Sequence, residues 1–219
     1  MVFAAVRHWL GDMFRKDAPV VDAATLADFL DAHAAFIVQK CIYEYARARA
    51  GTMSLALFKE EGFKAAVETS RWQNYPLGLQ YVGEMALTVL RPDWPGGAAD
   101  LADRLAGILT AITARYPVPE GFAADFWEIE RASIAEHLRH AALAQPKPVK
   151  DIPLATVEMF FARLPIHERL RGYDYQLIQN NLRINLCRSY ETFLERLDRE
   201  ALLADLAAGR PSVALPAGG

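Results

Sequence analysis

The sequence has few cysteines, no long apolar run and no large excess of charge. Only Cys41 and Cys187 are present, each within a helical pattern of apolar residues, which argues against a disulfide-bonded scaffold and favours a reducing compartment. The longest uncharged interior stretches, 72–83 and 105–114, are shorter than the ~20 apolar residues that a membrane-spanning helix needs. We therefore predict no transmembrane segment.

The charge balance is close to neutral, with 24 Lys and Arg against 27 Asp and Glu, a net charge of −3 and a pI near 6.0. Proteins that bind nucleic acid usually carry a basic face or tail, so no nucleic-acid partner is expected. The N-terminal apolar residues include Arg7 and Asp12 and follow no basic leader, which does not fit a secretory signal. A cytoplasmic location is the resulting prediction.

The sequence motifs of common enzymes and cofactor sites are absent. There is no phosphate-binding G-x-x-x-x-G-K-[ST], no dinucleotide-binding G-x-G-x-x-G, no G-x-S-x-G and no C-x-x-C. His167 and Glu168 begin like the zinc-protease motif H-E-x-x-H, but Arg171 stands where the second histidine is needed. These absences predict no cofactor and favour a protein without catalytic activity.

What the sequence does contain is a helical pattern along almost its whole length. Alanine and leucine dominate, and β-branched residues build no alternating run. The predicted fold class is all-α, a multi-helix bundle of about eight helices joined by short loops rich in proline and glycine. The predicted helices cover about 2–16, 22–50, 54–74, 77–90, 101–112, 119–144, 153–164 and 174–208.

Residues 1–208 are predicted to form a single helical domain. A sub-boundary near 145–150 is left open, because Gln145-Pro-Lys-Pro148 is the best linker candidate in the chain. Residues 209–219 carry two prolines and no packing pattern, and they predict a flexible C-terminal tail.

The long helix predicted at 174–208 carries a polar stripe beside its apolar seam. Asn181, Asn185 and Arg188 are spaced four and three residues apart, so they lie on one helix face together with Asp174 and Thr192. Asparagine beside an apolar seam needs hydrogen-bond partners. Those partners could belong to neighbouring helices of the same chain, to a second subunit, or to a ligand whose carboxylate or phosphate Arg188 binds; a solvated flank is the remaining alternative.

Arg71, Trp72 and Tyr75 form a second unusual cluster just before Pro76, which is expected to break or kink the chain. Aromatic side chains beside a guanidinium are typical of interface hot spots. They also stack together for purely structural reasons, and that interpretation is favoured.

His137 and His140 are the best candidates for metal ligands, since they lie three apart on one helix with Glu136 beside them. A metal site needs a third or fourth ligand from elsewhere, with His33 as one candidate. The simpler interpretation is a helix whose buried stripe becomes polar near its solvated end, and we predict no metal.

The absence of catalytic motifs and the abundance of aromatic residues favour a non-enzymatic interaction or assembly protein. Its expected partner is another protein or a second copy of itself, bound through apolar and aromatic helix faces. Two alternatives stay open: binding of an apolar small molecule or lipid, and an enzyme of unrecognised type that uses His137, His140 and Glu136. The amphipathic segment 2–16, with Trp9 among its aromatic residues, is expected to pack on the bundle or a partner, and peripheral membrane contact is the weaker alternative.

Overall fold

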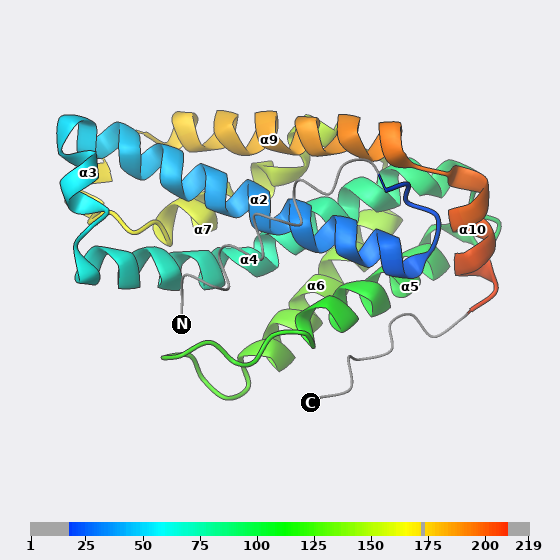
Figure 1. The fold of residues 1–219 in the computed structure, drawn as a ribbon. Coiled ribbons are helices and arrows are strands. Elements are labelled where there is room, and N and C mark those ends of the chain that lie inside the picture. The colour runs from blue at the N-terminus through cyan, green and yellow to red at the C-terminus, as the bar shows by residue number, and fades with distance from the viewer. Residues whose placement is uncertain (1–17, 172–173, 210–219) are drawn as a thin grey trace.

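The computed structural model describes residues 18–171 and 174–209, and over these ranges the chain folds into helices with no β-strand (Figure 1). The predicted all-α multi-helix bundle is therefore confirmed. No helix in the described ranges has both the length and the apolar character needed to cross a bilayer. The helix predicted at 2–16 and nearly all of the predicted tail lie outside the described residues.

The longest described helices, α2, α4 and α9, extend along the bundle (Figure 1). In chain order the elements are α2 (Ala23–Ala50), the 3₁₀ helix η1 (Gly51–Met53), α3 (Ser54–Leu57), α4 (Glu61–Leu90), η2 (Arg91–Asp93), α5 (Gly97–Thr113), α6 (Phe126–Leu143), η3 (Val149–Ala155), α7 (Val157–Ala162), α8 (Glu168–Arg171), α9 (Tyr175–Arg196) and α10 (Arg199–Ala207).

The ends of α2 match the predicted helix because its capping residues are local. The Asp22 carboxylate accepts a hydrogen bond from the Thr25 backbone N–H at 2.8 Å, and the Asp22 backbone N–H donates to Thr25 Oγ1 at 3.1 Å. This reciprocal pair satisfies two N–H groups that the first turn leaves free. Gly51 then ends the helix with a φ of 52°, a conformation that favours glycine.

The predicted break at Pro76 is wrong, since α4 continues through this residue to Leu90. A proline inside a helix costs about 3 kcal/mol, because its N–H is missing and its ring disturbs the preceding turn. Here the Gln73 carbonyl in that turn accepts a hydrogen bond from the Arg163 side chain. Every residue from 74 to 87 is buried, and this burial outweighs the local cost.

The sixth helix begins at Phe126 rather than near Pro119 as predicted. Gly121 adopts a φ of 83°, a conformation that a right-handed helix does not contain. Residues 114–125 therefore form a loop.

The predicted helix at 174–208 is two helices, because the chain turns at Leu197. The Val20 backbone N–H donates to the Arg196 carbonyl at 2.7 Å, and the Asp198 N–H donates to the Val20 carbonyl at 3.0 Å. The Asp198 side chain then accepts from the Ala201 N–H at 3.1 Å and caps α10. The residues before α2 thus bind the backbone groups that the break exposes.

Two more predicted helices are interrupted. Between α3 and α4 the chain turns back so that the ring of Phe58 stacks on Tyr43, with 5.3 Å between ring centroids. At 153–164 the structure has a 3₁₀ helix followed by α7, and Pro153 lacks the N–H that an α-helix would use there.

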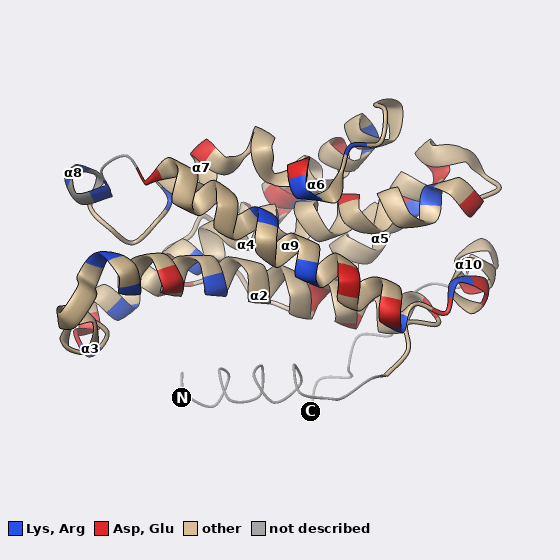
Figure 2. Ribbon diagram, turned by 90° about the horizontal axis from the view of Figure 1, so that it is seen from above, with Lys and Arg blue, Asp and Glu red and all other residues tan. Residues whose placement is uncertain are grey.

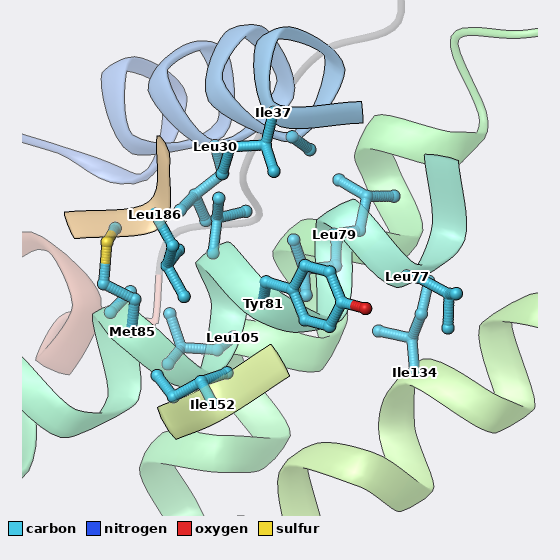
Figure 3. Packing of buried hydrophobic residues seen from close by; sticks show 14 of the residues in the cluster. Leu30, Ile37, Leu77, Leu79, Tyr81, Met85, Leu105, Ile134, Ile152 and Leu186 are labelled. Carbon is cyan, nitrogen blue, oxygen red and sulfur yellow. The ribbon is translucent and has the colours of Figure 1, made fainter. Parts of the chain in front are cut away.

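The hydrophobic core surrounds α4 and receives residues from the helices on every side of it. Residues 145–148 connect α6 to η3 without helix, and buried residues before and after this connection belong to the same cluster. Figure 3 labels ten of the cluster's residues: Leu30, Ile37, Leu77, Leu79, Tyr81, Met85, Leu105, Ile134, Ile152 and Leu186.

Candidate functional site

The polar stripe on α9 faces α2 and is used for contacts inside the chain. Asn185 is only 2% exposed, so it is not part of a solvated flank. Its Nδ2 donates to the Asn181 carbonyl at 3.0 Å and to Asn181 Oδ1 at 2.5 Å. Asn181 Nδ2 in turn donates to Glu44 Oε2 on α2 at 2.7 Å. The pair of asparagines therefore bonds α9 to α2, while Asn185 Oδ1 is buried without a hydrogen-bond partner.

The surroundings of Glu44, the carboxylate that accepts from Asn181, favour its charged form. Burial opposes the charge on Glu44, but hydrogen bonds from Lys40 and Asn181 outweigh it and lower the Glu44 pKa. Lys40 Nζ lies 2.6 Å from Glu44 Oε1. Arg188 is exposed and favours the charge on Glu44 electrostatically, so it lies at the outer edge of the polar stripe.

Ser189 and His33 extend the same contact toward the other end of α9. Ser189 Oγ donates to the Asn185 carbonyl at 3.1 Å, and His33 Nδ1 lies 2.8 Å from Ser189 Oγ. The imidazole tautomer decides whether His33 Nδ1 or Ser189 Oγ is the donor in this contact. Burial, with a smaller effect of Arg196, lowers the His33 pKa to about 4. Sequence reasoning missed Ser189, although it stands four residues after Asn185 on the same face.

The predicted cluster of Arg71, Trp72 and Tyr75 stays together in the structure, and Trp72 Nε1 donates to Glu68 Oε1 at 2.8 Å. Arg71 forms an ion pair with Glu68 at 2.6 Å. Trp72 is half-buried and packs edge-on against Tyr75, with 5.9 Å between ring centroids. Tyr116, from the loop after α5, and Trp127, from α6, pack edge-on against the same Trp72 ring.

Tyr75 leads to a buried carboxylate that the sequence did not reveal. Asp31 Oδ1 accepts from the Tyr75 hydroxyl at 2.6 Å and from the Tyr116 hydroxyl at 2.8 Å, and Arg115 Nη1 lies 3.3 Å from Oδ2. Burial raises the Asp31 pKa, although all three donors favour its charged form. The sequence does contain one sign of this site: Asp31 is an acidic residue between Leu30 and Ala34 on the apolar face of α2.

The histidine candidates do not converge on a metal site. His137 Nε2 lies 2.8 Å from Glu84 Oε2, and Lys147 Nζ lies 3.0 Å from Glu84 Oε1. His140 and Glu136 are exposed. Within residues 18–171 and 174–209, no three His, Cys, Asp or Glu side chains lie close enough together to hold a metal ion.

Glu84 was missed by sequence reasoning because it comes from a different helix than His137. It belongs to a polar row between α4 and α6 in which Gln80 Nε2 also donates to Ser133 Oγ at 3.1 Å. A buried carboxylate hydrogen-bonded to an imidazole fixes the orientation of the ring. Lys147 adds an ion pair that attaches the 145–148 connection to this row.

Neither cysteine has the environment of a nucleophile. Cys41 is buried, and burial raises the pKa of its thiol. Burial likewise raises the pKa of Cys187. Reactive cysteines need the opposite shift, so both thiols stay protonated at neutral pH.

Large apolar side chains are exposed on the outer face of α9 and at the turn between α2 and α4. On the outer face of α9, Leu177, Ile184 and Leu194 are 47%, 53% and 42% exposed. At the turn between α2 and α4, Met53 is 65% and Leu55 is 79% exposed.

Comparisons with models of protein families, with curated proteins and with solved structures find no match to this chain. The clusters on α2, α4, α6 and α9 mostly bond helices to one another, which directs attention to the exposed apolar surfaces.

Proposed function

We propose that this is a non-enzymatic assembly protein that pairs with a second copy of itself through the outer face of α9. The observation that carries the proposal is the exposed apolar row of Leu177, Ile184 and Leu194 on a helix whose opposite face is buried. Single exposed leucines are ordinary on protein surfaces, but a row along one helix face supports a docking surface.

The spacing of these residues fits a helix partner. They are seven and ten residues apart, which places all three within about 100° of the helix circumference. Ile184 and Leu194 are separated by about 15 Å along the axis, the length of nearly three turns. A second amphipathic helix lying along α9 would cover both.

The charges on the same face favour an antiparallel copy of α9 as that helix. Arg188 lies on the N-terminal side of residue 189, whereas Glu191 and Glu195 lie on its C-terminal side; Arg183 already pairs with Asp151 within the chain at 3.2 Å. A two-fold axis near residue 189 would bring the basic part of each helix against the acidic part of the other. The same register would bring Ile184 of each copy against Leu194 of the other.

The inner face of α9 supports this use because it holds the helix in place. Asn181 bonds to Glu44, and Ser189 to His33, so polar contacts as well as apolar packing attach α9 to α2. A docking helix fixed in this way loses little freedom when a partner binds.

The test is sedimentation velocity on the full chain over a range of concentrations. The wild-type protein should sediment as a dimer at high concentration. Ile184→Asp should weaken pairing by about a hundredfold, because two apolar contacts of about 1.5 kcal/mol each are lost per dimer. Leu143→Asp is the matched control, since Leu143 is an exposed apolar residue on α6.

A charge exchange tests the register. Arg188→Glu alone should weaken pairing, and adding Glu191→Arg should restore it, because the double variant keeps one basic and one acidic group on each helix. A wild-type protein that stays monomeric at all concentrations, or Ile184→Asp and Leu143→Asp variants that pair equally well, would contradict the proposal.

A further inference from the structure

A different surface points to a second kind of partner. We infer that the turn between α2 and α4, here called the α2–α4 corner (residues 40–64), docks on the surface of a membrane that contains anionic lipids. This surface is separate from the outer face of α9.

The apolar part of the corner projects from a short turn. Met53 and Leu55 are among the most exposed large apolar side chains of the described residues. Tyr43 stacks on Phe58 with an interplanar angle of 3°, and Phe58 packs edge-on against Phe63 with 5.2 Å between ring centroids. This aromatic stack anchors the turn to both helices and leaves its two exposed residues free to insert between lipids.

The charge of the corner is opposite to that of the whole protein. Residues 40–64 contain five Lys or Arg and three Asp or Glu, although the entire chain has a net charge of −3. The ion pairs Lys40–Glu44 and Lys64–Glu61 cancel two charges of each sign, and Arg49 pairs with Asp174. Arg47 and Lys59 then remain against Glu60. Arg47 and Lys59 form no ion pair with any described residue, and their charge is therefore available to an anionic surface.

The corner lies at one end of the bundle, where a planar surface can approach it. Figure 1 shows α3 at the end of α2 and α4 that is opposite to α10. Basic residues recur along the adjoining part of α2 and on α8, which lies at the same end (Figure 2). The exposed cation Arg169 on α8 widens the basic surface beyond the corner itself.

A lipid surface fits this corner better than a protein partner does. Met53 and Leu55 project from one short turn and form no row along a helix face, so they offer a partner helix little to cover. Membrane docking instead combines a small inserted apolar area with attraction between cations and anionic lipids. An aromatic ring beside the inserted residues is also typical of the membrane–water interface.

The experiment is co-sedimentation of the full chain with large vesicles, either of phosphatidylcholine alone or with about one third phosphatidylserine. Wild-type protein should bind the anionic vesicles, and binding should fall as salt is raised. Arg47→Gln and Lys59→Gln should each weaken binding about fivefold. Arg139→Gln, which removes an exposed cation on α6, should leave binding unchanged.

The apolar contribution is tested separately with a matched pair of leucines. Leu55→Glu should reduce binding at least tenfold, whereas Leu143→Glu should not, although Leu143 is equally exposed at 82%. Circular dichroism of each variant checks that its helices are retained.

Segment 2–16 is tested in the same assay with Trp9→Glu. Retention of binding in Trp9→Glu together with its loss in Leu55→Glu supports the α2–α4 corner. Failure of the wild-type protein to bind anionic vesicles, equal binding to neutral vesicles, or unchanged binding in Leu55→Glu would overturn the inference. These outcomes do not depend on dimer formation, which sedimentation velocity reports independently.

Discussion

Asp31 on α2 accepts a 2.6 Å hydrogen bond from Tyr75 on α4, and this contact joins the two longest helices of the described chain through a buried carboxylate. Tyr116 and Arg115 approach the same carboxylate from the loop after α5. Three elements are therefore attached to one another at a single charged group. Its burial makes the contact sensitive to pH and to the loss of any donor.

Tyr75→Phe should destabilise the protein by about 1–3 kcal/mol near neutral pH, because a buried carboxylate loses a donor. Burial already raises the Asp31 pKa, and the Tyr75 hydroxyl opposes that rise, so the variant should raise the pKa further. A group with a raised acid pKa contributes stability below its unfolded-state pKa and loses it as pH rises through the folded-state value. The destabilisation by Tyr75→Phe should thus grow with pH in urea unfolding experiments. An equal loss at every pH would contradict this assignment.

His33 should make the folded state sensitive to acid. Its pKa is lowered to about 4, so the stability that comes from keeping it neutral is complete above the unfolded-state value and is lost as pH falls through about 4. Neutral His33 contributes at most about 3 kcal/mol to the free energy of unfolding. His33→Phe should flatten the dependence of unfolding free energy on pH between these values. A variant that keeps the wild-type slope would show that another group titrates there.

Asn185 should tolerate leucine better than alanine. Its Oδ1 is buried without a partner, so Asn185→Leu removes an unsatisfied group and should change stability by less than about 1 kcal/mol in either direction. Asn185→Ala also leaves space between α9 and α2, and it should cost about 1–3 kcal/mol. Thermal melts of the two variants separate these outcomes. Equal melting temperatures for both would contradict the packed arrangement.

Purified protein should carry no stoichiometric transition metal, because only His137 and Glu84 come together while His140 and Glu136 are exposed. Elemental analysis measures this directly. About one zinc or iron per chain, lost in His137→Ala, would overturn the prediction. In the metal-free protein, His137→Ala should still cost about 1–3 kcal/mol, since buried Glu84 loses a partner.

Local signals predicted the fold well where a helix end is decided by neighbouring residues. The capping pair of Asp22 and Thr25 and the stop at Gly51 all lie within the segment that they delimit. Pro76 was misread because the burial of residues 74–87, which outweighs its local cost, depends on packing against other helices. The break after Arg196 was missed because its backbone partner, Val20, is distant in the sequence.

At the candidate site, too, the sequence predicted what lies within one helix but not the contacts between helices. Helical spacing correctly put Asn181 and Asn185 on one face, because spacing is a property of a single helix. Their carboxylate partner Glu44, and the partners Asp31 and Glu84 of the other clusters, stand on separate helices. Which helices pack together is decided by the whole core, and the sequence pattern of one helix does not contain that information.

Antiparallel pairing of α9 is tested most directly by disulfide crosslinking between two variants. Ile184→Cys and Leu194→Cys are made separately in a Cys187→Ser background and mixed under mild oxidation. The proposed register brings the new thiols within disulfide range only in mixed dimers, because in a dimer of either variant alone they are about 15 Å apart along the helix axis. A crosslinked dimer in the mixture and none in either variant alone is the predicted result. No crosslink in the mixture, or equal crosslinking in all three samples, would contradict it.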